Sequence, residues 1–167
     1  MTLEQRVVVA PTDGSLGPLL RIADDRLAPH AGYGRHEHRA VDVVAVVLAG
    51  SLRHRWGDGA ELAAGDVAVL RAGAGLEHDE VAGSEGARVL QCYLRSAVPG
   101  APAAHEVRPA ATGWVDLGRP DARLWIGTGP APEGLRIGVG EEPAVVGGGS
   151  GPAVVWEVAT GRPAWAQ

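Results

Sequence analysis

Short hydrophobic runs separated by turn residues follow one another along most of the chain. Some runs alternate apolar and polar residues and others are apolar throughout, which is typical of β-strands buried on one face or on both. Turn pairs such as Gly50-Ser51 and Gly65-Asp66 separate the runs, whereas helical periodicity is almost absent. The pattern predicts an all-β fold, either a sandwich or a barrel. The expected strands are Arg6–Ala10, Leu19–Ala23, Val41–Leu48, Ser51–Trp56, Asp66–Arg71, His78–Val81, Arg88–Arg95, Ala122–Gly127, Leu135–Gly140 and Ala153–Ala159.

The predicted strands become sparse after residue 97. The segment AVPGAPAA (97–104) has the composition of a linker, and we find no repeat of fixed period along the chain. We therefore expect a compact β unit at residues 1–96, followed by a smaller β annex at residues 97–167.

The composition is that of an ordinary globular protein, with 46% hydrophobic and 21% charged residues and a formal net charge of −5 in 167 residues. All 15 basic residues are arginines, so no lysine is available to form a Schiff base. The acidic balance gives no general attraction for nucleic acid. The single cysteine, Cys92, excludes an internal disulfide and a cysteine-rich metal site, and we expect it in the core.

The chain shows no segment that we expect to enter a membrane. Glu4 and Arg6 lie where a signal peptide needs an apolar stretch, and the longest apolar run, Val43–Gly50, is far too short to span a bilayer. These features predict a cytoplasmic protein.

Two pairs of polar residues carry the candidate chemistry. His36 and His38 are two residues apart, so on a strand both imidazoles point to one face, and the same spacing relates His78 to Glu80. If the pairs face each other, three nitrogens and one oxygen surround an ion and leave positions open for a substrate or dioxygen; this donor set suits Fe(II), Mn, Ni, Cu or Zn. A surface strand with alternating polar residues would also produce the His-x-His string. The second pair, His78 and Glu80, is therefore the stronger evidence for a metal site.

These residues belong to two longer motifs. The first motif contains His36, His38, Asp42 and Gly50. The second is GDVxxxxAGxGxxHxE, beginning at Gly65 and ending at Glu80. Position by position, the two motifs resemble the metal-binding motifs of the cupin barrel, in the form found in pirin and the pirin-like quercetinases.

The resemblance covers roughly residues 15–96. It implies a cupin fold, that is, a double-stranded β-helix or jelly-roll barrel, and it implies that His36, His38, His78 and Glu80 are the metal ligands. Only the 71 residues 97–167 remain where a pirin has a full second barrel, and they contain His105 but no His-x-His pair. We therefore expect a truncated, metal-free second β unit.

Asp42 stands where the first motif usually carries glutamate. We expect Asp42 to accept a hydrogen bond from a ligand imidazole and so fix its tautomer, the alternative being an exposed aspartate. His54, between Arg53 and Arg55, is expected either beside the site, behind the ligands, or as a hydrogen-bonded histidine of the barrel interior.

Several other polar residues are interpreted as surface groups. His30 and His105 lie in contexts rich in proline or alanine and are expected at the surface. The acidic pairs Asp24-Asp25 and Glu141-Glu142 are expected to be solvated.

The resemblance implies a metal-dependent dioxygenase of the quercetinase type, with Fe(II) as the expected ion and Ni, Mn, Cu, Co or Zn as alternatives. Its partners would be dioxygen and a flavonol-like or other phenolic or enediol molecule, with Glu80 as the general base and catalytic residue. We expect Val44, Val46, Val67 and Val69 to line the substrate pocket if their faces point inward.

Two other functions remain open. Some pirins are metal-dependent binding or regulatory proteins, and cupin barrels also host isomerases and lyases, because a fold does not determine a function. The run Val41–Leu48 is apolar on both faces, so one face would pack on the annex or on a partner chain, and the protein would be a monomer or a homodimer.

Overall fold

The computed structural model describes residues 2–160, and these form strands and loops without a helix. The expectation of an all-β protein is therefore confirmed. Since the described residues contain no helix, they also contain none that could cross a membrane. The strands are β1 (Leu3–Val9), β2 (Leu19–Leu27), β3 (His36–His38), β4 (Val41–Arg55), β5 (Ala60–Ala63), β6 (Val67–Arg71), β7 (Leu76–Arg95), β8 (Ala104–Arg108), β9 (Gly113–Val115), β10 (Ala122–Gly127), β11 (Leu135–Gly138), β12 (Ala144–Val145) and β13 (Ala153–Val158).

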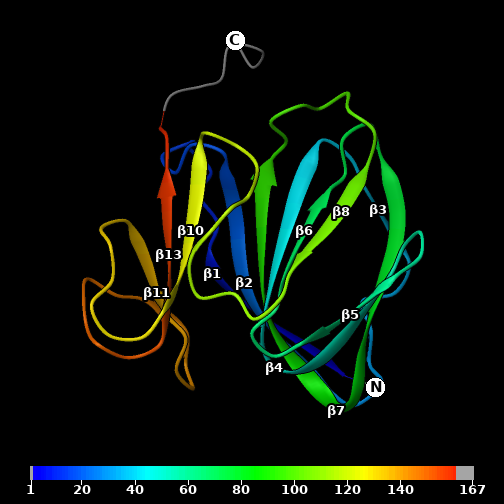
Figure 1. Ribbon diagram of the computed structural model, residues 1–167, viewed down its shortest axis with the longest axis horizontal. Helices are drawn as coiled ribbons and strands as arrows, with labels where there is room; N and C mark the ends of the chain where they lie inside the picture. Colours follow the sequence, from blue (N-terminus) through cyan, green and yellow to red (C-terminus); the bar gives the residue numbers. More distant parts are fainter. Residues whose placement is uncertain (1, 161–167) are drawn as a thin grey trace.

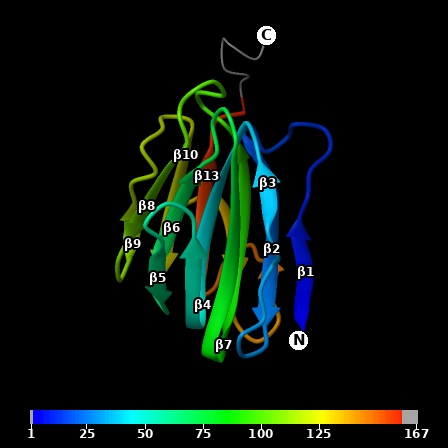
Figure 2. The ribbon, with the colours of Figure 1, turned by 90° about the vertical axis from the view of Figure 1, so that its right-hand side faces the viewer.

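The strands form two antiparallel sheets that lie against each other (Figure 1). The larger, eight-stranded sheet has the order β1-β2-β7-β4-β6-β8, with β3 paired to β7 and β5 paired to β4. The smaller, five-stranded sheet has the order β12-β11-β13-β10-β9. In the view of Figure 2, β1 lies at one edge of the molecule and the long strand β7 runs along most of its height.

The two long strands β4 and β7 each join two of the strands expected from the sequence. The register of β4 against β7 shifts between Val47 and Ala49, so Leu48 has no partner and forms a bulge. Gly50, two residues on, has a φ of 70°, and a Cβ on it would lie 2.0 Å from the carbonyl oxygen of Gly86. Glycine at this position therefore lets the chain continue as one bent strand across the bulge.

The bulge also exchanges the two faces of β4. Before it, Ala45 and Val47 share a buried cluster with Leu52, which lies after it. The even-numbered residues Val44 and Val46 instead point to the opposite face, where they pack on the five-stranded sheet.

The main hydrophobic core lies between the two sheets. It includes Cys92, as expected, and Val44, Val46, Val67 and Val69 of the larger sheet. From the smaller sheet it receives Leu124, Ile137, Val154 and Trp156. The expectation that the four valines line a substrate pocket is therefore wrong, because the bulge turns the other face of β4 toward the histidines, and the annex covers the valine face.

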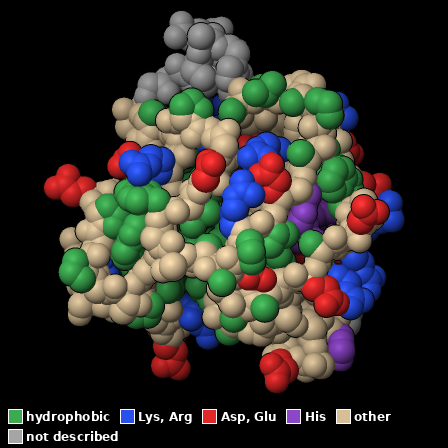
Figure 3. Space-filling model, viewed as in Figure 1, with side chains coloured by type: hydrophobic (Ala, Val, Ile, Leu, Met, Phe, Trp, Pro, Cys, Tyr) green, Lys and Arg blue, Asp and Glu red, His purple; other side chains and the backbone are tan. Residues whose placement is uncertain are grey.

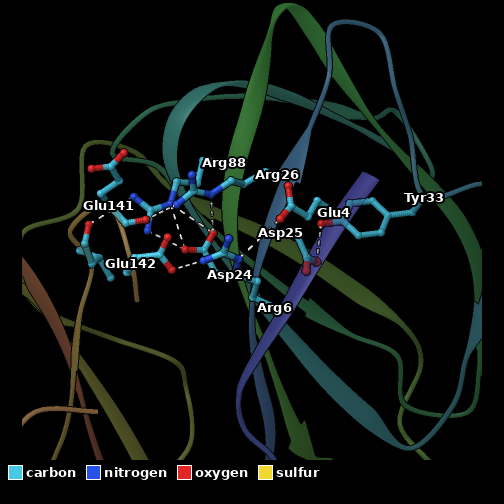
Figure 4. A network of polar contacts seen from close by, with 10 residues as sticks. Glu4, Arg6, Asp24, Asp25, Arg26, Tyr33, Arg88, Glu141 and Glu142 are labelled. Atoms are coloured by element: carbon cyan, nitrogen blue, oxygen red, sulfur yellow. Dashed lines mark hydrogen bonds and ion pairs between the residues drawn. The ribbon is translucent and has the colours of Figure 1, made fainter. Parts of the chain in front are cut away.

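A network of polar contacts also joins the sheets (Figure 4). Arg88 of β7 donates to both carboxylate oxygens of Asp24, at 3.1 and 3.0 Å, and to the carbonyl oxygen of Val139, at 3.3 Å. Arg26 donates to the carbonyl oxygen of Glu141, and Arg6 pairs with Glu142.

The acidic pair Asp24-Asp25 lies inside this region, on β2. Both residues are buried, so the expectation of a solvated pair is wrong. Arg88 neutralises Asp24, and the Tyr33 hydroxyl donates to Asp25 at 2.7 Å. These long-range partners make the burial of two adjacent carboxylates possible, and a local sequence pattern gives no sign of them.

The short strands β3, β5, β8, β9 and β12 are additional to the strands listed from the sequence. β8 begins at the end of the segment interpreted as a linker and pairs with β6 of the larger sheet. The division into units at residues 1–96 and 97–167 stays a prediction, and residues 161–167 of the second unit lie outside the described residues.

Candidate metal centre

Three histidines from two neighbouring strands converge on one point. β3 pairs with β7 so that His36 lies directly opposite His78, and His38 follows on the same face of β3. The Nε2 atom of His36 lies 3.0 Å from Nε2 of His38 and 2.9 Å from Nε2 of His78. The three ring nitrogens are thus close enough to share a single ion.

The ring of His36 is oriented by the backbone. Its Nδ1 atom lies 2.7 Å from the carbonyl oxygen of Gly34, which can only accept a hydrogen bond. This contact assigns the proton to Nδ1 and leaves the lone pair of Nε2 directed at His38 and His78, as metal coordination requires.

Glu80 lies two residues after His78 on β7, directly opposite His54 of β4. Its Oε1 atom contacts Nε2 of His54, and its Oε2 atom accepts a hydrogen bond from the Gln91 amide at 2.8 Å. Burial by itself raises the pKa of the Glu80 carboxyl, but His54 and Gln91 outweigh it and hold that pKa below its ordinary value. The carboxylate is therefore ionised and bonded through both oxygens.

Burial also favours the neutral form of two imidazoles, those of His38 and His78. It lowers the pKa of His78 to about 4 and is the main cause of a lowered pKa at His38, to which the neighbouring His36 also contributes. Because a metal ion binds the neutral imidazole, the rings of His38 and His78 are ready for coordination at neutral pH.

The donor atoms form two overlapping sets, in each of which they lie within 4.8 Å of one another. One set is His36, His38 and His78, and the other is His54, His78 and Glu80. Imidazole nitrogens with a carboxylate oxygen suit a divalent first-row transition metal. The two sets share His78 alone, so His36 and His38 are close to it in one set and His54 and Glu80 in the other. The assignment of His36, His38, His78 and Glu80 to a single ion stays a prediction.

His105 was expected at the surface, and this expectation is wrong. It lies in β8 and its ring stacks on that of His54, with the centroids 4.5 Å apart and an angle of 25° between the planes. Burial lowers the pKa of His105 to about 4. The alternation in AHEVR (104–108) was the available signal, and the Ala- and Pro-rich residues before it concealed the strand.

Asp42 does not have the role expected for it. Its Oδ2 atom accepts a hydrogen bond from Arg119 at 2.9 Å, and both side chains are buried. No imidazole bonds to Asp42 within residues 2–160. Burial raises the pKa of the Asp42 carboxyl, and Arg119 offsets part of that rise. Asp42 therefore attaches β4 to the segment before β10, a role that depends on an arginine 77 residues away in sequence.

A cleft of about 750 Å³ opens beside His54 and His78. The turn between β4 and β5, with Trp56 and Asp58, forms one wall, and Arg35 and Glu77 form part of another. His36 and His38 are half-buried, whereas His54, His78 and Glu80 are buried. The space-filling view shows a histidine reaching the surface over the larger sheet, among charged side chains (Figure 3).

Comparisons with known proteins agree with this arrangement. The profile of the Pirin family matches residues 10–94, which is just over half of the chain. A protein of Zymomonas mobilis with the name "Putative quercetin 2,3-dioxygenase" is 41% identical over 59 residues, which cover 34% of this chain and 25% of that protein. A pirin-like protein of Caulobacter vibrioides is 31% identical over 87 residues, which cover 50% of this chain and 38% of that protein. The chain therefore matches well under half of the length of these two relatives.

A solved structure has the same fold over most of the chain. The bacterial pirin YhhW from Escherichia coli, in complex with nickel(II), superposes with a TM-score of 0.68 at 18% identity, covering 93% of this chain and 82% of that one. The expected cupin jelly-roll is thus confirmed as the fold class, although the ends of the larger sheet, β1 and β8, do not pair with each other within the described residues. From its fold, its two motifs and the matching profile, the chain belongs to the pirin family.

Proposed function

We propose that the protein is a metal-dependent dioxygenase of the quercetinase type, acting on a flavonol-like or other phenolic or enediol molecule. The observation that carries this proposal is the convergence of three imidazoles next to a buried, ionised carboxylate, beside a cleft of about 750 Å³. That volume lies within the range of sites for small ligands. The name of the Zymomonas mobilis relative supports the reaction type.

His36, His38, His78 and Glu80 would hold the ion, which we expect to be Fe(II), with Ni, Mn, Cu, Co or Zn as alternatives. A bound ion of this kind would supply a Lewis-acidic position for a substrate oxygen and for dioxygen. The nickel(II) complex of YhhW supports a divalent ion in this fold.

A side chain of the protein would accept the proton of the substrate hydroxyl. Glu80 is the general base, because a carboxylate oxygen beside the bound hydroxyl can take the proton as the substrate anion forms. Gln91 donates to Oε2 at 2.8 Å and so holds the carboxylate in one orientation. Trp56 in the cleft wall offers an aromatic side chain with which a flat ring can pack.

The test is elemental analysis of anaerobically purified protein, followed by oxygen-uptake assays with flavonols and other phenols or enediols. We expect His36→Ala to abolish both metal binding and oxygen uptake, because it removes a central nitrogen of the cluster. Glu80→Gln should lower kcat more than it weakens substrate binding, since it removes the base and keeps the shape of the side chain. Equal kcat in the Glu80→Gln and wild-type proteins would show that Glu80 is not the base.

A second candidate is a metal-dependent binding or regulatory protein of the pirin type. One observation favours it: both oxygens of Glu80 already contact side chains of the protein, so the carboxylate is less free to act as a base. Metal binding without oxygen uptake on any of the substrates tested would support this candidate, and a metal-dependent isomerase or lyase would then be sought by product analysis.

A further inference from the structure

His54 contributes a nitrogen to the cluster that the four proposed ligands do not account for. It belongs to β4, whereas those ligands lie in β3 and β7. We propose that His54 is a fifth protein ligand of the same ion. This inference rests on the proposed function in one respect, namely that an ion binds His78 and Glu80.

The strand register places His54 in line with the other donors. β7 lies between β3 and β4, with His78 opposite His36 on one side and Glu80 opposite His54 on the other. Directly opposite residues of antiparallel strands have Cβ atoms about 4.5–5.5 Å apart. The donors therefore lie across three neighbouring strands, in two sets that share His78. A single ion with all five ligands requires the two sets to close around His78.

The donor atoms of these side chains are also close to one another. His54, His78 and Glu80 each offer a donor atom, and the three atoms lie within 4.8 Å of one another. Metal–nitrogen and metal–oxygen bonds are about 2.0–2.2 Å long, so an ion bound to two of these atoms is within reach of the third after small adjustments.

The surroundings of His54 hold its ring in place and keep water away. The side chain is 1% exposed, and His105 stacks on it at 4.5 Å between centroids. The ring is therefore fixed with Nε2 directed at Oε1 of Glu80. This arrangement resembles the support that a ligand histidine needs to keep its orientation.

Coordination by His54 removes an unfavourable contact that would arise when Glu80 binds the ion. The carboxylate uses Oε2 for Gln91 and Oε1 for His54. An ion bound through Oε1 would lie next to the Nε2–H group of the buried His54 ring, and repulsion between the cation and this N–H group is costly. Binding of the same ion by Nε2 removes this cost, whereas the bond to Gln91 is kept.

The proposal changes what the centre can bind. With five protein ligands an octahedral ion retains one open position, whereas four protein ligands leave two. His54 would thus occupy a position that is otherwise free for a substrate or dioxygen.

The experiment is a count of ligating imidazoles in the Co(II)-loaded protein by proton NMR, because the ring N–H protons of histidines bound to Co(II) appear outside the normal spectral range. Affinity alone cannot decide, since loss of a hydrogen-bond partner of a ligand also weakens metal binding 10–100-fold. The decisive variant is His54→Gln, whose amide nitrogen can still donate to Glu80. The matched control is His30→Gln, which removes an exposed histidine outside the cluster.

We expect four shifted N–H signals in the wild-type protein and in His30→Gln, and three in His54→Gln, together with at least tenfold weaker Co(II) binding in that variant. Three signals in the wild-type protein, unchanged in His54→Gln, would overturn the role of His54 while leaving the proposed function intact. Failure of the wild-type protein to bind Co(II), Fe(II) or Ni(II) would overturn both. The wild-type count decides the question even if His54→Gln does not fold.

Discussion

Three ring nitrogens in the interior of the larger sheet have no hydrogen-bond partner within the described residues: Nδ1 of His54, Nδ1 of His78 and Nε2 of His105. The rings of His78 and His105 resist protonation, because the added charge would be poorly solvated in the buried site. Burial accordingly lowers the pKa values of His78 and His105 to about 4. The cluster is therefore a source of acid sensitivity as well as a candidate metal centre.

The pH dependence of the free energy of unfolding tests whether His105 makes the protein sensitive to acid. An unfolded histidine has a pKa of about 6.5. Burial lowers the pKa of His105 in the folded protein to about 4. The neighbouring His54 lowers this pKa further, whereas Glu80 and Glu106 raise it. Between these values the unfolded chain binds more protons, so this contribution to stability is complete above pH 6.5 and is lost as the pH falls toward 4. We expect His105→Gln to show a shallower loss of the free energy of unfolding over this interval in urea titrations of the metal-free protein. An identical slope in both proteins would contradict the prediction.

The contribution of Asp25 to stability changes with pH in the opposite direction to that of His105. Burial raises the pKa of its carboxyl above the ordinary value of 3.8, and the hydrogen bonds from Tyr33 and Gln5 offset only part of the rise. The ionised carboxylate therefore costs stability at neutral pH, and the cost disappears as the pH falls below the unfolded value. We expect Asp25→Asn to be more stable than the wild-type protein at pH 7, with an advantage that shrinks on acidification.

The adjacent position supplies the control for this prediction. Asp24 pairs with Arg88 and is equally buried, so Asp24→Asn should destabilise the protein at pH 7. Urea titrations of both variants from pH 7 to pH 3.5 measure the two effects. Destabilisation by Asp25→Asn at pH 7 would show that the carboxylate is better stabilised than its surroundings indicate.

At the scale of elements, the bend of β4 depends on Gly50. Its φ of 70° disfavours any other residue, and an added Cβ would also lie 2.0 Å from the Gly86 carbonyl oxygen. Gly57 provides a matched comparison, because its φ is 58° and nothing lies within 4 Å of the added Cβ. We expect Gly57→Ala to cost about 1 kcal/mol of unfolding free energy, from backbone strain alone. Gly50→Ala should cost roughly 1–3 kcal/mol more, from the clash. Equal costs in thermal or urea unfolding would show that the Gly50–Gly86 contact relaxes freely.

The elements also show which parts of the fold a sequence pattern can predict. Ala122–Gly127 was predicted with the observed bounds, because its apolar run is flanked by turn residues on both sides. In β4 the pair Gly50-Ser51 was interpreted as a turn, although it lies within a continuous strand, next to a bulge. β8 was missed because the Ala- and Pro-rich residues before it concealed the alternation in AHEVR (104–108), and its pairing with β6 cannot be read from a local pattern.

At the scale of the whole molecule, Arg88 links the two sheets, because it pairs with Asp24 inside the larger sheet and donates to the Val139 carbonyl oxygen beside the smaller one. Asp24 is completely buried and the Arg88 side chain is 18% exposed, and Arg88 also reaches the backbone that follows β11. We expect Arg88→Met to lower the free energy of unfolding by about 3–5 kcal/mol, because it leaves a buried carboxylate without its partner. Arg6→Met, which removes an exposed pair with Glu142, should cost at most about 1 kcal/mol. A small effect of Arg88→Met would indicate that water or Arg26 replaces the lost partner.

The sequence by itself determined the β character of the chain and the two donor pairs. Both depend on local spacing, since residues two apart on a strand share a face whatever the strand pairs with. It also carried the motifs through which family membership is recognised. Only the tertiary structure decided that His54 and His105 join the cluster, that Asp42 binds Arg119, and that the valine face of β4 packs on the five-stranded sheet. Those outcomes depend on strand register, on the bulge at Leu48 and on pairing between distant segments, and these are settled by packing over the whole molecule.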